Sequence, residues 1–301
     1  MSHVIETKGL TQRFGKTEAV KNLTLQVPQG SIFAFLGPNG AGKTTTIKAF
    51  MNILEPSEGT ATVFGVDSRR LGPDQFSRIG YVSENQELPE WMRVGQFLEY
   101  CKPMYPSWDD EFCEKLLKQF SLSRDQKIKS MSRGMKVKTA LLSSLAYRPQ
   151  LLVLDEPFSG LDPLVRDEFI RGVLELTEQE SWTVFISSHD IDEVERLADW
   201  VGILNQGRLE LAEGIASLQA RFRKIEVVVR GEGTIPKTLP EHWLTLEKAA
   251  HTIRFVDSRY AENETEKTIP VHFPDCAGVT AQPMSLREIF LTLARTYRLV
   301  A

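Results

Sequence analysis

The sequence has little of what marks secreted, membrane-spanning or nucleic-acid-binding proteins. It contains only three cysteines, an odd number without C-x-x-C spacing, which favours reduced, buried thiols over disulfides or a metal centre. Its 36 Lys and Arg residues do not outnumber its 40 Asp and Glu residues, so no excess of positive charge indicates nucleic acid as a partner. Because no basic region followed by an apolar stretch opens the chain, we expect no secretion signal and a cytoplasmic protein.

Long apolar runs are scarce as well. Residues 22–42 form an uncharged run long enough to span a bilayer, but its glycines and prolines favour a strand, a turn and a second strand. The rest of the composition, with 42% hydrophobic and 25% charged residues, is that of a globular protein. At ~150 residues per domain, a chain of 301 residues is expected to form about two domains.

The pattern of apolar residues predicts a parallel sheet with crossover helices. Short buried strands are expected at 31–36, 150–155 and 183–187, and each precedes a helical pattern. Asp190 and Glu193 are expected to form a capping box on one of these helices. Between about 87 and 147 the strand signal gives way to helical spacing, which predicts a mainly helical subdomain.

After about residue 218 the sequence changes to short apolar runs separated by polar loops, which predicts a domain boundary. We expect one domain over residues 1–218 and a small α+β domain over 219–301. A capping box of Ser285 and Glu288 opens its last helical pattern. Its short strands are expected at Ile225–Val229, Thr252–Phe255 and Ile269–Phe273.

A glycine-rich loop lies between a predicted strand and a predicted helix and matches the phosphate-loop pattern G-x-x-x-x-G-K-[ST]. Glycines let backbone N–H groups curl around a triphosphate at a helix N-terminus. Lys43 adds a positive charge at the β- and γ-phosphates, and the Thr44 hydroxyl is a ligand for Mg²⁺. The expected phosphate-binding residues are Gly37, Pro38, Asn39, Gly40, Ala41, Gly42, Lys43, Thr44 and Thr45.

The strand predicted at 150–155 ends in two carboxylates, Asp155 and Glu156. At this place a Walker-B acid reaches the metal and its neighbour meets the attacking water. Many strands end in Asp-Glu by chance, so the pattern gains its meaning from the phosphate loop upstream. We expect Asp155 to be a metal ligand and Glu156 to be catalytic.

Together these motifs resemble the nucleotide-binding subunit of an ATP-binding cassette (ABC) transporter over residues ~1–220. The signature at 131–135, the D-loop at 159–162 and the switch histidine His189 stand in the order typical of that family. The resemblance implies an α/β fold of the P-loop NTPase class. This fold has a parallel-sheet ATP-binding core, an antiparallel β subdomain, a helical insert and here a small C-terminal α+β domain.

The resemblance also assigns roles to single residues. Ser132 and Gly134 would face the γ-phosphate of an ATP bound to the opposite subunit, and Asp162 of the D-loop joins the ATP-binding set. His189 would be catalytic, and Phe14 would stack on adenine. Without the family resemblance, Ser132 would be interpreted as a plain helix cap, and His189 and Phe14 as structural residues.

Two motifs depart from the family pattern. Arg133 and Met135 replace the first glycine and the glutamine of the signature. Glu84 stands where the glutamine of the Q-loop is expected, and Gln86 follows two residues later. A carboxylate is a harder oxygen ligand than an amide, so we expect Glu84 to serve the metal, with Gln86 as the alternative sensor. The expected metal ligands are thus Thr44, Asp155 and Glu84.

The resemblance implies an ATPase with ATP and Mg²⁺ as cofactors. It implies a homodimer, or a heterodimer with a second ABC ATPase, that powers translocation through a separate membrane permease at the inner face of the cell membrane. Export is inferred from the tail at 284–291, which is similar to that of bacterial drug- and lipid-exporter ATPases. No nucleic acid is expected.

Two other functions remain open at this stage. A soluble mechanical ABC ATPase would act on a macromolecular complex such as the ribosome or DNA; a single P-loop and a pI of about 5.9 count against it. A regulator that binds ATP without hydrolysing it is suggested by Arg133 and Met135 in the signature.

Overall fold

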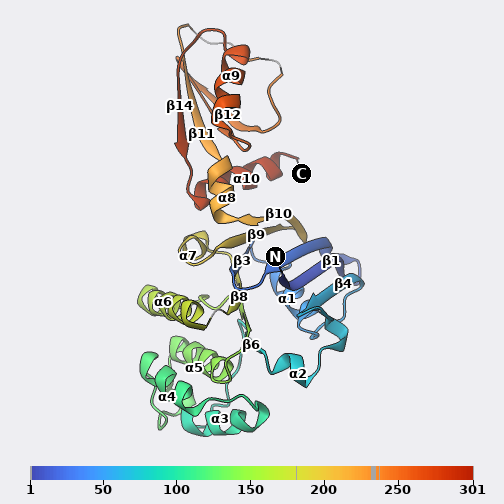
Figure 1. Cartoon of the computed structure of the whole chain (residues 1–301), viewed down its shortest axis with the longest axis vertical. Coiled ribbons are helices and arrows are strands. Elements are labelled where there is room, and N and C mark those ends of the chain that lie inside the picture. Colours follow the sequence, from blue (N-terminus) through green and yellow to red (C-terminus); the bar gives the residue numbers. More distant parts are fainter. Residues whose placement is uncertain (1, 181, 232–234, 237, 301) are drawn as a thin grey trace. The chain divides into compact units, whose positions relative to one another are not determined.

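The computed structural model describes residues 2–180, 182–231, 235–236 and 238–300. The chain divides into the compact units Met1–Ala212 and Glu213–Ala301 (Figure 1). The division falls before helix α8 (Ile215–Arg221), whereas the boundary was predicted at 218/219. An ion pair of 2.7 Å between Arg221 and Glu213 links the two ends of this segment within the second unit.

The central sheet of the first unit is built mainly from parallel strands in the order β10-β9-β3-β8-β7-β6. Strand β3 pairs in parallel with β8 and β9, and β7 pairs in parallel with β6 and β8. The strands are β3 (Ile32–Leu36), β6 (Ile79–Val82), β7 (Leu151–Asp155), β8 (Thr183–Ser188), β9 (Trp200–Asn205) and β10 (Arg208–Gly214). This confirms the predicted parallel core, with β10 added by a hairpin turn after β9.

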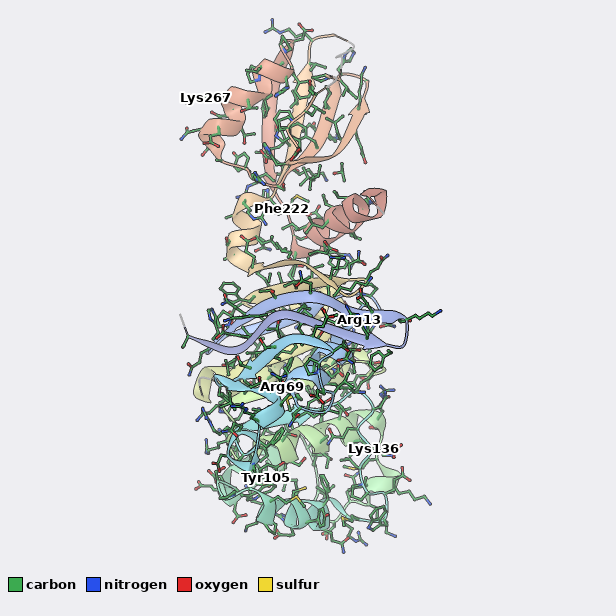
Figure 2. All side chains as sticks on the ribbon, turned by 90° about the vertical axis from the view of Figure 1, so that its right-hand side faces the viewer. Arg13, Arg69, Tyr105, Lys136, Phe222 and Lys267 are labelled. Atoms are coloured by element: carbon green, nitrogen blue, oxygen red, sulfur yellow. The ribbon has the colours of Figure 1, made fainter. Side chains whose placement is uncertain are left out.

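A separate antiparallel sheet lies beside this core in the order β2-β1-β4-β5. Its strands are β1 (His3–Phe14), β2 (Thr17–Pro28), β4 (Glu58–Val63) and β5 (Val66–Asp67). Arg13, near the end of β1, pairs with Glu18 on β2 at 2.9 Å and with Glu58 on β4 at 2.5 Å (Figure 2). The antiparallel β subdomain that the family resemblance implies is therefore present.

Helices follow the strands and form the insert. Helix α1 (Lys43–Phe50) follows β3, and α6 (Pro163–Glu180) and α7 (Ile191–Glu195) follow β7 and β8. The insert between β6 and β7 holds α3 (Val94–Cys101), α4 (Asp110–Gln119) and α5 (Arg133–Leu145), together with the short turns η2 (Lys102–Met104) and η3 (Ile128–Ser130). The remaining short helices are η1 (Ser68–Arg70) and α2 (Pro73–Phe76). No helix in the described part of the chain is both long and apolar enough to cross a membrane.

The second unit has its own antiparallel sheet, in the order β12-β13-β11-β14, and its own core. Trp243 stacks on Phe255 with ring centres 4.3 Å apart. The elements are β11 (Arg223–Val229), β12 (Trp243–Ala249), β13 (Thr252–Asp257), α9 (Glu262–His272), β14 (Cys276–Pro283) and α10 (Leu286–Val300). The predicted capping box opens α10, since Ser285 N donates to Glu288 Oε2 at 2.9 Å and Glu288 N donates to Ser285 Oγ at 3.2 Å.

The strand predicted at Ile269–Phe273 is wrong, because this segment is the end of helix α9 and its C-cap. Thr265, Ile269 and Phe273 are buried at a spacing of four residues, which is the period of a helix face. Ile269 and Phe273 pack into the core of the sheet. The apparent alternation around the exposed Pro270 therefore comes from a helix that carries a proline in its last turn.

An aromatic cluster holds the central sheet to helix α1. The ring of Phe185 on β8 packs against Phe33, Phe35 and Phe50 with centroid distances of 5.7, 5.4 and 5.2 Å. All four side chains are fully buried. The cluster thus fixes β3, β8 and α1 to one another.

We predict that Phe185→Ala lowers the free energy of unfolding by about 3–5 kcal/mol, because it leaves a cavity in a closely packed aromatic cluster. Urea unfolding followed by tryptophan fluorescence measures the change. The matched control is Ile53→Ala, at an exposed position, which is expected to change the value by less than about 0.5 kcal/mol. Equal losses in the two variants would contradict the assigned core.

Candidate active site

Residues 37–42 of the phosphate loop form the turn between β3 and α1, and Lys43, Thr44 and Thr45 lie in the first turn of that helix. The loop is packed so tightly that only glycine fits at two positions. A Cβ on Gly37 would lie 2.4 Å from Leu204 O, and one on Gly42, whose φ is +106°, would lie 2.4 Å from Ala19 O. The backbone N–H groups at the start of α1 are thereby held as an anion-binding turn.

The side chain of Lys43 reaches back into this turn. Its Nζ donates to the carbonyl oxygens of Gly37 at 2.7 Å and Pro38 at 3.2 Å. It also makes an ion pair of 2.9 Å with Glu156 Oε1, and the two side chains are only 5% and 8% exposed. The positive charge is therefore fixed at the mouth of the loop and compensated by the second acid of the predicted Walker-B pair.

Glu156 joins Lys43 to His189. Its other carboxylate oxygen, Oε2, lies 2.7 Å from Nδ1 of His189. The backbone of Glu156 has φ of +48°, in the left-handed region that non-glycine residues seldom adopt. Glu156 directly follows β7, and this conformation turns its carboxylate towards the phosphate loop. The two residues predicted to be catalytic are thus brought into contact.

Asp155, next to Glu156 in the chain, makes a separate set of contacts with two hydroxyl groups. Its Oδ1 accepts from Thr44 Oγ1 at 3.1 Å and from Ser187 Oγ at 2.7 Å. Ser187 Oγ also accepts from the N–H of Glu156 at 2.9 Å, which ties both acids to β8. Ser187 was not predicted; a serine inside an otherwise apolar strand was the available signal.

Burial raises the pKa of Asp155 above its ordinary 3.8. Hydrogen bonds from Ser187 and Thr44 act in the opposite direction, and the nearby charges of Glu156 and Glu84 add to the rise. Ionised Asp155 is therefore held at a cost in stability, which is typical of a carboxylate that awaits a cation.

A magnesium ion fits this donor set. The Thr44 hydroxyl and the Asp155 carboxylate are hard oxygen ligands that already lie within hydrogen-bond distance of each other. Among the described residues no group of three or more His, Cys, Asp or Glu side chains could hold a metal by itself. Such an ion would therefore take its other ligands from a nucleotide and water.

The remaining predicted ATP-binding residues have local roles in this chain. Ser132 caps α5 by accepting from Met135 N at 3.3 Å, and Asp162 caps α6 by accepting from the N–H of Val165 at 3.1 Å. Gly134 packs so closely on Val165 that a Cβ would lie 2.8 Å from its Cγ1. Among the described residues, no hydrogen bond or ion pair joins any of these three directly to Lys43, Glu156 or His189.

Phe14 lies at the end of β1 and is 51% exposed. Its neighbour Arg13 makes two exposed ion pairs across the sheet. An exposed ring at the end of a strand is suited to stacking on a flat ligand. The assignment of adenine to this ring stays a prediction.

Comparisons with known proteins agree with the geometry. Residues 20–159 match the family model described as "ABC transporter". The "Bacitracin transport ATP-binding protein BcrA" of Enterococcus faecalis is 30% identical over 272 residues, covering 89% of this chain and 88% of that protein. The chain belongs to the ABC transporter ATP-binding family. The resemblance inferred from the motifs is thereby confirmed.

Other members of the family extend the comparison. A protein of the same name from Bacillus licheniformis is 29% identical and covers 97% of this chain. A solved structure described as "Structure of ATP binding subunit of ABC transporter" superposes with a TM-score of 0.65 at 26% identity, covering 72% of this chain and 92% of that one. The fold class predicted from the sequence is confirmed by this structural likeness.

The departures from the ABC pattern lie close together. Glu84 and Arg133 both line a cavity of about 360 Å³ between the loop after β6 and helix α5. The Arg133 guanidinium also packs against Gly160 of the D-loop, its central carbon 3.1 Å from the place of a Cβ on that glycine. Gln86 lines the same cavity and accepts from Ser83 N at 3.3 Å. The charge of Glu84 adds a small contribution to the raised pKa of Asp155.

We predict that Asp155→Asn raises the melting temperature of the nucleotide-free protein at about pH 8. Asparagine keeps the acceptor for Thr44 and Ser187 but has no charge to desolvate. Because burial raises the folded-state pKa of Asp155 above 3.8, its ionisation lowers stability as pH rises through and above that value. The gain should therefore shrink as pH falls towards about 4 in scanning calorimetry. A variant less stable than the wild type at pH 8 would refute this account.

Proposed function

We propose that the chain is the ATP-hydrolysing subunit of an ABC transporter, which binds MgATP and drives export through a separate membrane permease. The observation that carries the proposal is the pair of contact sets at the carboxyl ends of the strands. Lys43, Glu156 and His189 form one set, and Thr44, Asp155 and Ser187 form the other. Both flank the anion-binding turn of the phosphate loop.

Each side chain has a chemical task in this proposal. Thr44 and Asp155 would hold Mg²⁺, which supplies positive charge at the β- and γ-phosphates when bound. Lys43 neutralises the same oxygens from within the loop. Glu156 accepts the proton of the attacking water, and His189 at 2.7 Å fixes the orientation of that carboxylate.

Dimerisation belongs to the same proposal. Ser132 and Arg133 at the start of α5 are exposed, and they belong to the signature that the family directs at the ATP of an opposite subunit. Their lack of contact with Lys43 or Glu156 is what a site completed by a second cassette requires. A homodimer and a heterodimer with another ABC ATPase both satisfy this requirement.

The permease and the direction of transport rest on the relatives. The relatives from Enterococcus faecalis and Bacillus licheniformis are both described as "Bacitracin transport ATP-binding protein BcrA". The match to the second covers 98% of that protein's length. The tail at 284–291 adds the likeness to exporter ATPases. The proposed location is therefore the cytoplasmic side of the membrane, bound through the permease.

We predict that Glu156→Gln lowers kcat for ATP hydrolysis by about 10²–10⁴-fold, because the group that accepts the proton is lost while the phosphate contacts remain. Light scattering with saturating MgATP should show a trapped dimer. Lys43→Ala is the matched comparison, since it removes a phosphate contact and should weaken ATP binding itself.

Two results would overturn this proposal. A wild-type protein that binds ATP but never hydrolyses it, alone or with its permease, would favour the regulator instead. A Glu156→Gln variant that stays monomeric with MgATP, with any partner ATPase and permease supplied, would refute the composite site.

We predict that Glu84→Ala raises the Mg²⁺ concentration for half-maximal ATPase activity and leaves metal-free nucleotide affinity unchanged. The reason is that Glu84 adds negative charge beside Asp155. Gln86→Ala is the matched control two residues away. If Gln86→Ala causes the shift and Glu84→Ala does not, the sensor of the Q-loop is Gln86.

A further inference from the structure

Helices α6 and α7 are joined, next to the switch histidine, by an ion pair whose carboxylate is buried and whose guanidinium is 31% exposed. Arg166 Nη1 of α6 lies 2.8 Å from Glu193 Oε1 of α7, and Glu193 is only 5% exposed. Glu193 was predicted to close a capping box with Asp190. That prediction is wrong: Asp190 caps α7 through Asp192 N at 3.0 Å, and Glu193 is turned inward to Arg166 and Ser188.

The inward carboxylate holds the turn that carries His189. Glu193 Oε2 accepts from Ser188 Oγ at 3.0 Å, and Ser188 Oγ accepts from Asp190 N at 3.0 Å. The residues on both sides of His189 are therefore fixed by one hydrogen-bonded group. The reach of the His189 ring to Glu156, at 2.7 Å, depends on where this turn lies.

The other end of the ion pair is anchored one turn into α6. Arg166 N donates to Asp162 O at 3.0 Å, and Asp162 both ends the D-loop and caps the helix. Nη1 of Arg166 also lies 3.4 Å from Asp190 Oδ2. A continuous set of contacts thus runs from the D-loop through Arg166 and Glu193 to the switch histidine.

We propose that Arg166 and Glu193 are positioning residues for ATP hydrolysis, whose ion pair holds His189 against Glu156 and makes that contact follow the position of the D-loop. This inference rests on the proposed function. Neither residue belongs to the sets that bind phosphate or metal, so their loss should act on turnover and leave nucleotide binding intact.

Burial disfavours the charged form of Glu193. Burial raises the pKa of Glu193 from its ordinary 4.5 to about 7, although the Ser188 hydroxyl and the charges of Arg166 and His189 lower it, and Asp190 raises it further. A neutral glutamine would fit the same space and still accept from Ser188. A carboxylate that destabilises the fold at neutral pH is more easily understood if its charge serves turnover.

The main experiment compares Glu193→Gln and Arg166→Met with the wild type in steady-state ATPase assays from about pH 6 to 8.5. At pH 8 we expect kcat to fall by about tenfold or more in each variant, with KM for ATP unchanged within about twofold. Wild-type kcat should fall as pH drops through about 7, because Glu193 becomes protonated. This step should be missing in Glu193→Gln, while steps from other groups remain.

Arg196→Met is the matched control. Arg196 pairs with Asp167 of α6 at 2.6 Å, so it also links the segment after α7 to α6, but this pair is exposed and does not contact Ser188. We expect its kcat to stay within about twofold of the wild type. If Arg196→Met and Arg166→Met lower kcat equally, the Arg166–Glu193 ion pair only attaches the two helices to each other, and the inference is overturned.

A stability measurement separates this inference from the proposed function. The melting temperature of Glu193→Gln minus that of the wild type should grow as pH rises from about 4.5 to about 7, since only the wild type must bury a charge. This readout needs no ATPase activity, so an inactive wild type would refute the proposed function alone. A difference that does not change with pH, or wild-type kcat in Glu193→Gln, would overturn the inference. Arg166→Gln, which also lacks the charge, replaces Arg166→Met if the latter does not fold.

Discussion

The parallel register of β3, β8 and β7 is the constraint on which the site depends. Leu36 of β3 lies opposite Ser188 of β8, and Asp155 of β7 lies opposite Ser187. Because parallel strands end at the same edge of a sheet, the phosphate loop, the paired carboxylates and the switch histidine all leave the sheet at one place. A shift of register between β7 and β8 would move Asp155 away from Ser187, and with it the metal side of the site.

The two acids at this edge are held in different ways. Glu156 lies between Lys43 and His189, and Asp155 is held by two hydroxyl groups without an opposite charge. Unpaired charges in a buried site are destabilising, whereas paired charges are tolerated. Glu156 is therefore compensated without a ligand, while the cost of burying ionised Asp155 would be relieved by a bound cation.

The same principle extends behind the site. Arg166 and Glu193 form a second ion pair, with its carboxylate buried, which connects the D-loop helix with the turn that bears His189. Glu84 and Arg133, which depart from the family pattern, line one cavity. The residues around the predicted catalytic side chains thus come from several elements, which are joined by electrostatic contacts rather than by sequence proximity.

The sequence by itself determined where the phosphate loop and the paired carboxylates lie, between β3 and α1 and at the end of β7, since these motifs are contiguous. It also determined the parallel core, where apolar runs leave little choice. It did not reveal Ser187 as the hub between Asp155 and Glu156, nor that Glu193 turns away from its expected cap.

Tertiary structure decided these points because they depend on which strand or helix lies alongside. Ile269–Phe273 shows the limit most clearly: its short apolar pattern suits a strand or a helix end, and only burial against the sheet of the second unit selects the helix. Glu193 does not close the expected capping box, because its carboxylate is turned inward to Arg166 of another helix and to Ser188, and the N–H of Asp190 donates to Ser188 Oγ instead.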